Sequence, residues 1–190
     1  MLVGVFRQNF REDFTIEKSF ACAVIWHIEP LPLQKISDSV MKVFISGSIS
    51  KKSLTENELA YMEQIVEGKN TILIGDAYGV DKAVQQILVE NNYQQVMVYF
   101  SGETVRNNLG NWQTKQIPNP ENLTGRSRYQ LKDKAMADDC DSGIMFWDGK
   151  SKGTQHNMDY MNKLDKYHLV VTSTGLGVGN MHKINNMIIL

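Results

Sequence analysis

The sequence has few cysteines and no net excess of charge of either sign. Its two cysteines, Cys22 and Cys140, have no CxxC partner and no neighbouring Cys or His, so we expect neither a disulfide scaffold nor a metal site. The 20 basic and 21 acidic residues nearly cancel, so the chain lacks the broad positive field that attracts DNA or RNA. These absences favour a small-molecule ligand, no nucleic acid, no cofactor and a reducing, cytoplasmic location.

Long apolar runs are missing as well. The longest run near the start, residues 20–26, is far shorter than the roughly 20 residues that a helical membrane span needs, and acidic residues precede it. We therefore expect no signal peptide and no membrane partner. Residues 1–40 show no clear period, and we interpret them as a peripheral extension or as an upstream start assigned in error. Residues 41–172 then form the functional domain. Residues 173–190 form a tail in which the glycine cluster at 175–179 is a flexible link.

The length of 190 residues suffices for one α/β domain with a continuous core. From residue 41 onward, short β-rich runs alternate with helical periodicity, which is typical of a parallel sheet covered by helices on both faces. The predicted fold class is therefore α/β, a Rossmann-like three-layer sandwich with a mainly parallel sheet of about five strands. The predicted strands are 42–46, 71–75, 95–100, 143–147 and 168–172.

Local signals mark where the helices begin and end. Thr55 and Glu58 form a capping box, apolar residues with helical spacing follow, and Gly68 supplies the stop. Asp81 can act as the N-cap of the next helix. Apolar residues at helical spacing over 158–164 indicate a further helix, whose methionines we interpret as core filler.

Two glycine-rich turns each follow a predicted strand. One is Gly-Asp-Ala-Tyr-Gly-Val-Asp at 75–81, and the other is Gly-Lys-Ser-Lys-Gly-Thr at 149–154. A strand that breaks into such a turn and re-enters a helix points unpaired backbone N–H groups outward, where a phosphate can accept hydrogen bonds from them. Lys150, Lys152 and the Thr154 hydroxyl add positive charge and a further donor. Together the two turns predict a nucleotide site.

Two more segments offer groups for the same ligand. Arg106 and Trp112 lie in the polar segment 101–125, which either closes over a base and a phosphate or is a solvated loop pinned by a buried Trp. Arg128 and Lys132 lie one helical turn apart, and they either converge on a phosphate or form a solvated basic face. The candidate ligand-binding residues are Gly47, Ser48, Gly75, Gly79, Asp81, Arg106, Arg128, Lys132, Gly149, Lys150, Ser151, Lys152, Gly153 and Thr154.

Four segments in this order resemble the SLOG superfamily. They are Val-Phe-Ile-Ser-Gly-Ser at 43–48, Ile-Gly-Asp-Ala-Tyr-Gly-Val-Asp at 74–81, Lys-Asp-Lys-Ala-Met-Ala-Asp-Asp-Cys-Asp at 132–141, and Asp-Gly-Lys-Ser-Lys-Gly-Thr at 148–154. This Rossmann-like group includes the LOG phosphoribohydrolases, which release cytokinin bases from nucleoside monophosphates, and many nucleotide-binding bacterial and phage proteins. The resemblance covers residues 42–172. It implies a nucleotide-like ligand and a homodimer, because LOG relatives form dimers.

The chain departs from the LOG enzymes at two positions. Glutamates follow their last glycine turn, where this chain has Gln155, His156 and Asn157, and their upstream helix carries a catalytic arginine where this chain has Lys132. A closer resemblance is to less characterised SLOG members with a Trp-Asp-Gly-x-Ser-x-Gly-Thr turn. The first hypothesis is therefore non-catalytic binding or sensing of a nucleotide. The alternative is hydrolysis or transfer at an N-glycosidic bond of a nucleoside monophosphate or related nucleotide.

Such a reaction needs particular side chains. Cleavage of an N-glycosidic bond needs a carboxylate to stabilise an oxocarbenium-like sugar and an acid to assist the leaving base. Asp76, Asp81 and Asp148 are the carboxylates at predicted strand ends, and His156 can be the acid. The structural alternatives are an N-cap for Asp81, a turn former for Asp148 and a surface residue for His156. The catalytic candidates are Asp76, Asp148 and His156.

Overall fold

The computed structural model describes residues 40–172 and 175–179 of the chain. The predicted N-terminal extension up to residue 39 and most of the predicted tail lie outside the described residues. The helices are α1 (Glu56–Glu67), α2 (Val80–Glu90), α3 (Gly125–Asp139) and α4 (Lys152–Lys163). The strands are β1 (Lys42–Gly47), β2 (Thr71–Gly75), β3 (Val96–Phe100), β4 (Gln113–Gln116), β5 (Ser142–Phe146), β6 (His168–Thr172) and β7 (Gly175–Gly179).

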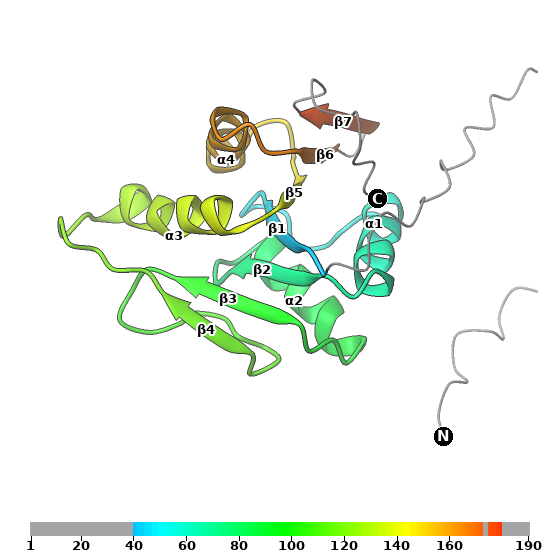
Figure 1. Ribbon diagram of the computed structural model, residues 1–190, viewed down its shortest axis with the longest axis horizontal. Coiled ribbons are helices and arrows are strands. Elements are labelled where there is room, and N and C mark those ends of the chain that lie inside the picture. The colour runs from blue at the N-terminus through cyan, green and yellow to red at the C-terminus, as the bar shows by residue number, and fades with distance from the viewer. Residues whose placement is uncertain (1–39, 173–174, 180–190) are drawn as a thin grey trace, which may run out of the picture. The chain divides into compact units, whose positions relative to one another are not determined.

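The strands form one sheet in the order β4-β3-β2-β1-β5-β6-β7 (Figure 1). Within the described residues, the six strands from β4 to β6 run parallel, and β7 pairs antiparallel with β6 at the edge. The predicted α/β, Rossmann-like fold is confirmed, and each of the five predicted strands is present within a residue of its expected bounds. The parallel sheet has one strand more than the five predicted.

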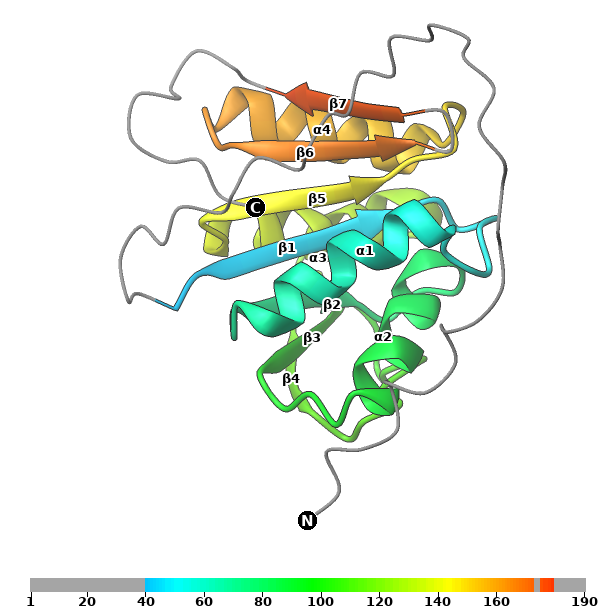
Figure 2. The same cartoon turned by 90° about the vertical axis from the view of Figure 1, so that its right-hand side faces the viewer.

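Helices cover both faces of the sheet. Figure 2 shows α1 and α2 in front of the strands and α3 and α4 behind them. In β1, Val43 and Ile45 belong to the apolar cluster that includes residues of α1 and α2, whereas Phe44 belongs to the cluster that includes residues of α3 and α4. Successive side chains of a strand point to opposite faces, so a strand buried on both faces is a continuous apolar run. This is why the inner strands could be located from sequence.

The capping box of α1 forms as predicted. The Glu58 amide donates to the Thr55 side chain at 3.5 Å, and the Thr55 amide donates to the Glu58 carboxylate at 2.8 Å. The N-cap prediction for α2 is wrong, because Gly79 rather than Asp81 occupies that position. A Cβ at Gly79 would lie 2.4 Å from the Ile49 carbonyl oxygen, and φ is +76° there. The close approach of the two chain segments therefore selects glycine at the helix start.

Two strands were not expected from sequence. β4 lies inside the segment 101–125 that was predicted to be a loop, and β7 lies at the glycine cluster that was predicted to be a flexible link. All four residues of β4 are exposed and polar, so this edge strand lacks the apolar alternation that identifies a strand. It is held by parallel backbone pairing with β3. β7 is likewise defined by its backbone pairing with β6.

The strand order reverses between β1 and β5. From β1 the chain continues through β2, β3 and β4 on one side, and it then returns to the other side of β1 at β5. In open parallel sheets, ligands bind in the crevice at the carboxyl ends of the strands where this reversal occurs. Gly47 and Phe146 are the last residues of the two strands, and they are paired in register. A ligand site in this fold is therefore expected at the loops that follow β1 and β5.

Candidate functional site

A cavity of about 300 Å³ lies at this point of reversal, and we call it the switch-point cavity. It collects residues from the segments after β1 and β2, from the loop before β4, from the first half of α3 and from the first turns of α4. Its lining includes Ser46, Gly47, Ile49, Ala77, Tyr78, Asp81, Arg106, Arg126, Tyr129, Lys132, Asp133, Ser151, Gly153, Thr154 and Asn157. Seven of the predicted ligand-binding residues are among them: Gly47, Asp81, Arg106, Lys132, Ser151, Gly153 and Thr154.

The start of α4 forms one side of the cavity. Ser151 is the N-cap, and its hydroxyl accepts a hydrogen bond from the Thr154 amide at 3.4 Å. Within the described part of the chain, no acceptor is bonded to the Gly153 amide. Free first-turn amides and the helix dipole together favour an anion at this position. A Cβ built on Gly153 would meet nothing nearer than the Ser151 hydroxyl at 3.9 Å, so the space beside this residue is open.

A buried ionic cluster forms another side. The ammonium of Lys132 lies 2.7 Å from an Asp133 carboxylate oxygen and 3.7 Å from an Asp81 carboxylate oxygen, and only 3% of Lys132 is exposed. Burial disfavours the ammonium, but the two carboxylates outweigh burial and raise the pKa of Lys132. Burial raises the pKa of Asp81, and the attraction of Lys132 only partly offsets this effect. The cluster packs against Gly75, where a Cβ would lie 2.3 Å from both Asp81 and Lys132.

Arg106 and Asp76 form a bidentate ion pair. The Arg106 guanidinium donates to Asp76 at 2.6 and 2.9 Å, and the Arg106 backbone amide donates to the same carboxylate at 3.1 Å. The guanidinium also stacks on the Tyr129 ring, 4.3 Å from its centroid. Burial opposes ionisation of Asp76, but the hydrogen bonds and charge of Arg106 outweigh burial and lower its pKa. Asp76 is thus ionised and fully engaged, and it does not line the switch-point cavity.

Asp148 closes the turn between β5 and α4. One carboxylate oxygen accepts from the Lys150 and Ser151 amides at 2.9 and 2.7 Å, and the other accepts from the Ser50 hydroxyl at 2.9 Å. These donors outweigh desolvation and hold the pKa of Asp148 well below its usual range. The predicted phosphate-binding turn therefore has two of its amides occupied by its own aspartate. Lys150 and Lys152 are exposed, and neither lines the cavity.

The segment 101–125 is pinned to the domain at several points. Trp112 is 7% exposed, belongs to the apolar core and donates through its indole nitrogen to the Tyr93 carbonyl at 2.8 Å. The Asn107 side chain donates to the Asp76 carbonyl at 2.8 Å, and buried Gln85 bonds the backbone on both sides of residue 108. Trp112 is buried as the second interpretation of this segment expected, and closure of the segment over a ligand stays a prediction. From this segment, Arg106 and Gly125 line the cavity.

The remaining predicted residues lie outside the switch-point cavity. Ser48 is buried, and its hydroxyl accepts from the Asp148 amide at 3.1 Å, which ties the loops after β1 and β5 together. Gly149 adopts a φ of +76° in the turn. His156 is half-buried on α4, and its Nε2 atom has no hydrogen-bond partner in the described part of the protein. The predicted site residues that do not line this cavity are Ser48, Gly75, Asp76, Gly79, Arg128, Asp148, Gly149, Lys150, Lys152 and His156.

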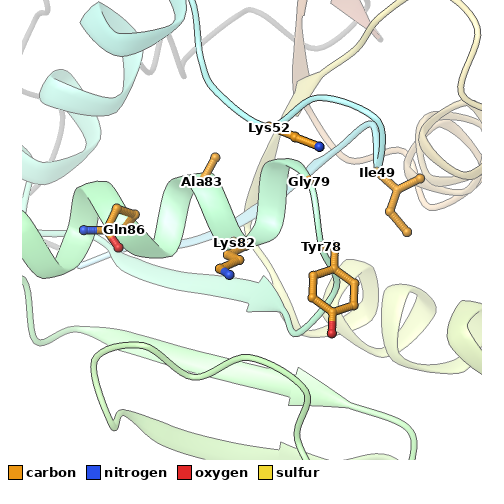
Figure 3. A pocket seen from close by; sticks show the side chains of 7 residues that line it. All are labelled: Ile49, Lys52, Tyr78, Gly79, Lys82, Ala83 and Gln86. Atoms are coloured by element: carbon orange, nitrogen blue, oxygen red, sulfur yellow. The ribbon is translucent and has the colours of Figure 1, made fainter.

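Two further cavities adjoin the switch-point cavity. The first, of about 390 Å³, is the Tyr78 cavity, lined by Ile49, Lys52, Tyr78, Gly79, Lys82, Ala83 and Gln86 (Figure 3). Ile49 and Tyr78 are 63% and 58% exposed and line both cavities, so they form a shared apolar rim. The second, of about 270 Å³, is the Arg128 cavity, lined by Asp76, Ser101, Gly102, Glu103, Thr104, Arg106, Arg128 and Tyr129.

Sequence reasoning missed several lining residues. Two of them, Tyr129 and Asp133, are one helical turn apart on α3. The same spacing is the basis on which the sequence pairs Arg128 with Lys132. The structure splits that predicted pair, because Lys132 lines the switch-point cavity whereas Arg128 lines the Arg128 cavity. Helical spacing offers both pairings equally, and only the packing of α3 decides between them. Asn157 was also missed, and it donates to the Ser46 hydroxyl at 2.7 Å.

Comparison with models of protein families, with curated proteins and with solved structures found no match to this chain. The resemblance to the SLOG superfamily accordingly stays a prediction. In residues 40–172 and 175–179, no group of three or more His, Cys, Asp or Glu side chains is arranged to hold a metal ion. No helix in the described part of the chain is long and apolar enough to cross a membrane.

Proposed function

We propose that this chain binds a nucleotide or a nucleotide-derived small molecule in the switch-point cavity and acts as a binding or sensing domain. One observation carries the proposal. The first turn of α4 and the buried cation Lys132 line the same cavity at the carboxyl ends of β1 and β5, and the Gly153 amide of that turn has no acceptor in the part of the chain that the structure describes. Helix N-termini at such crevices bind phosphate through their amides and dipole.

The charges of the lining suit a phosphorylated sugar. Lys132 is paired with Asp81 and Asp133, and Arg106 is paired with Asp76. Arg126 is therefore the lining cation that no ion pair engages within the described residues and that a phosphate can neutralise. A phosphate at the start of α4 accepts from the Gly153 amide. The carboxylate of Asp133 is an acceptor for sugar hydroxyl groups. This division of donors and acceptors is the reason to favour a nucleotide over a simple anion.

Aromatic side chains offer a surface for the base. Tyr78 stands exposed at the rim that the switch-point and Tyr78 cavities share. Tyr129 also lines the switch-point cavity from α3, and its ring already stacks with the Arg106 guanidinium. Aromatic rings stack on bases whatever their identity, since each base has a π-face. The volume of about 300 Å³ is at the lower end of the range for small-molecule sites, so the Tyr78 cavity supplies room for a larger base.

The resemblance to the SLOG superfamily supports the same ligand class. Membership in that superfamily, a cytoplasmic location and a homodimer of the LOG type are part of this proposal. So is the absence of a nucleic-acid or membrane partner. The near balance of 20 basic and 21 acidic residues supports a small ligand over a polyanion.

Isothermal titration calorimetry with a panel of nucleoside monophosphates, deoxynucleotides and NAD tests the proposal. We expect Gly153→Leu to weaken binding at least tenfold, because its side chain enters open space at the anion end of the cavity. Gln155→Leu is the matched control, since Gln155 is exposed on the same helix and does not line the cavity. Unchanged affinity in a folded Gly153→Leu protein refutes the assignment of the phosphate to α4.

Hydrolysis or transfer at an N-glycosidic bond is the second candidate function. The observation that favours it is Asp81, a buried carboxyl group with a raised pKa that lines the switch-point cavity beside Lys132. Such perturbed groups in a cavity are candidates for acid–base catalysis. Release of free base, followed by liquid chromatography with mass detection, tests this function. Loss of base release in Asp81→Asn with retained ligand binding supports it, and no base from any nucleotide of the panel counts against it.

A further inference from the structure

The Arg128 cavity holds two polar atoms that the fold leaves without partners. Ser101 is 3% exposed, and its hydroxyl oxygen has no hydrogen-bond partner in the described part of the chain. The Nε atom of Arg128 is also buried and without a partner there. Buried polar atoms of native proteins are almost always hydrogen-bonded, so two exceptions in the lining of one cavity indicate a missing ligand atom.

The charges around the cavity indicate the kind of ligand. Asp76 is neutralised by the bidentate bonds of Arg106. The guanidinium of Arg128 instead contacts Tyr129, with 3.2 Å to the hydroxyl and 5.1 Å to the ring centroid. No carboxylate pairs with Arg128 in residues 40–172 and 175–179, so its charge is free for an anion. Glu103 also lines the cavity, is exposed and opposes that anion.

We propose that the Arg128 cavity is a phosphate subsite, in which the Arg128 guanidinium and the Ser101 hydroxyl donate to the phosphate oxygens. Arginine suits this role, because its planar fork of N–H groups matches the oxygens of a phosphate. Arg106 and Tyr129 line both this cavity and the switch-point cavity, so the two sites adjoin. The phosphate is either a free ion or a phosphate of the ligand in the switch-point cavity, and the second source rests on the proposed function.

Titration with inorganic phosphate, followed by calorimetry, tests the subsite directly. We expect Arg128→Gln to weaken phosphate binding by about tenfold or more, as loss of a charge-assisted hydrogen bond predicts. Ser101→Ala should weaken it by a smaller factor, and Glu103→Gln should strengthen it. Lys134→Gln is the matched control, because Lys134 is an exposed cation on the same helix and lines none of the three cavities. Thermal unfolding confirms that each variant is folded, and Arg128→Lys, which keeps the charge, should bind with intermediate affinity.

The outcomes separate this inference from the proposed function. If Gly153→Leu abolishes binding of inorganic phosphate and Arg128→Gln does not, the phosphate sits at α4 and the subsite is refuted. No phosphate binding by the wild type at millimolar concentration refutes it as well. If phosphate binds through Arg128 but no nucleotide binds, the subsite stands and the proposed function fails. If phosphate and nucleotide compete for the wild type and this competition disappears in Arg128→Gln, the occupant of the subsite is the nucleotide's own phosphate. If phosphate and nucleotide bind at the same time, the occupant is a free ion.

Discussion

Replacing Gly75 by Ala tests whether the buried ionic cluster is as tightly packed as the structure shows. Gly75 ends β2, and an added Cβ would lie 2.3 Å from both an Asp81 oxygen and the Lys132 nitrogen. Gly75 is not among the glycines with positive φ, so alanine meets no backbone strain there. The whole effect of the substitution must therefore come from displacing the two charged groups.

The size of the effect follows from their burial. The side chains of Lys132 and Asp81 are only 4% and 10% exposed, but both line the switch-point cavity and the two clashing atoms are side-chain ends that can shift into it. Overpacking a buried site typically costs about 1–3 kcal/mol. We expect Gly75→Ala to lower the free energy of unfolding by about 1–2 kcal/mol, because the overpacked atoms are side-chain ends that can give way.

Urea unfolding followed by circular dichroism measures this change. Gly153→Ala is the control, because its Cβ enters open space in the first turn of α4 and alanine is the better helix former by about 0.5–1 kcal/mol. A second test adds Lys132→Met to Gly75→Ala, and the two changes should be less than additive because the methionine removes one of the two clashing groups. A Gly75→Ala protein within about 0.5 kcal/mol of the wild type would contradict the packing described here.

Three further predictions concern ionisable groups. Burial lowers the pKa of His168 below its ordinary 6.5, so near this pH the unfolded chain binds more protons than the folded protein. The free energy of unfolding should therefore fall as the pH drops below about 6.5. Urea unfolding at a series of pH values should show a smaller fall in His168→Asn. Burial raises the pKa of the Cys140 thiol to about 11, so few Cys140 side chains are thiolates at pH 7.5. In a Cys22→Ser protein we expect iodoacetamide at this pH to modify Cys140 only when the protein is unfolded. Rapid alkylation of the folded protein would contradict this. The lowered pKa of Asp148 means that its contribution to stability is present above about pH 4 and is lost as the pH falls further; Asp148→Asn should reduce the slope of stability against pH in acid.

The inner part of the fold could be predicted because its signals are local. Buried parallel strands are continuous apolar runs, and the capping box of α1 is complete within four residues, Thr55 to Glu58. β4 could not be predicted, because its four exposed polar residues carry no periodicity and the strand exists through backbone pairing with β3. The start of α2 depended on a contact distant in sequence, since the backbone at Ile49 selects Gly79 at the N-cap.

The candidate site was predictable in position but only partly in composition. The glycine turns after β2 and β5, which the sequence predicted, both contribute residues to the lining of the switch-point cavity. Two roles for Asp148 were open from sequence, a catalytic carboxylate and a turn former, because an aspartate before a glycine suits either. In the structure it accepts from the Lys150 and Ser151 amides, as a turn former does. The side of α3 that meets the cavity was also undetermined, since its charged residues recur at several helical spacings.

The carboxylates around the site bear on the choice between binding and catalysis. Asp76 is held by Arg106 and Asp148 by backbone amides, so each already has a structural role, and neither lines the switch-point cavity. Asp81 and Asp133 do line the switch-point cavity, but both share the ammonium of Lys132. If these carboxylates serve to fix the position of Lys132, Asp81→Asn should change the ligand dissociation constant and the stability together. If Asp81 is instead catalytic, the same variant should lose base release while the dissociation constant stays within about twofold of the wild type. Measuring stability, the ligand dissociation constant and base release on Asp81→Asn therefore separates the two roles. Loss of a positioning carboxylate changes the dissociation constant, whereas loss of a catalytic carboxylate leaves the dissociation constant nearly unchanged and removes base release.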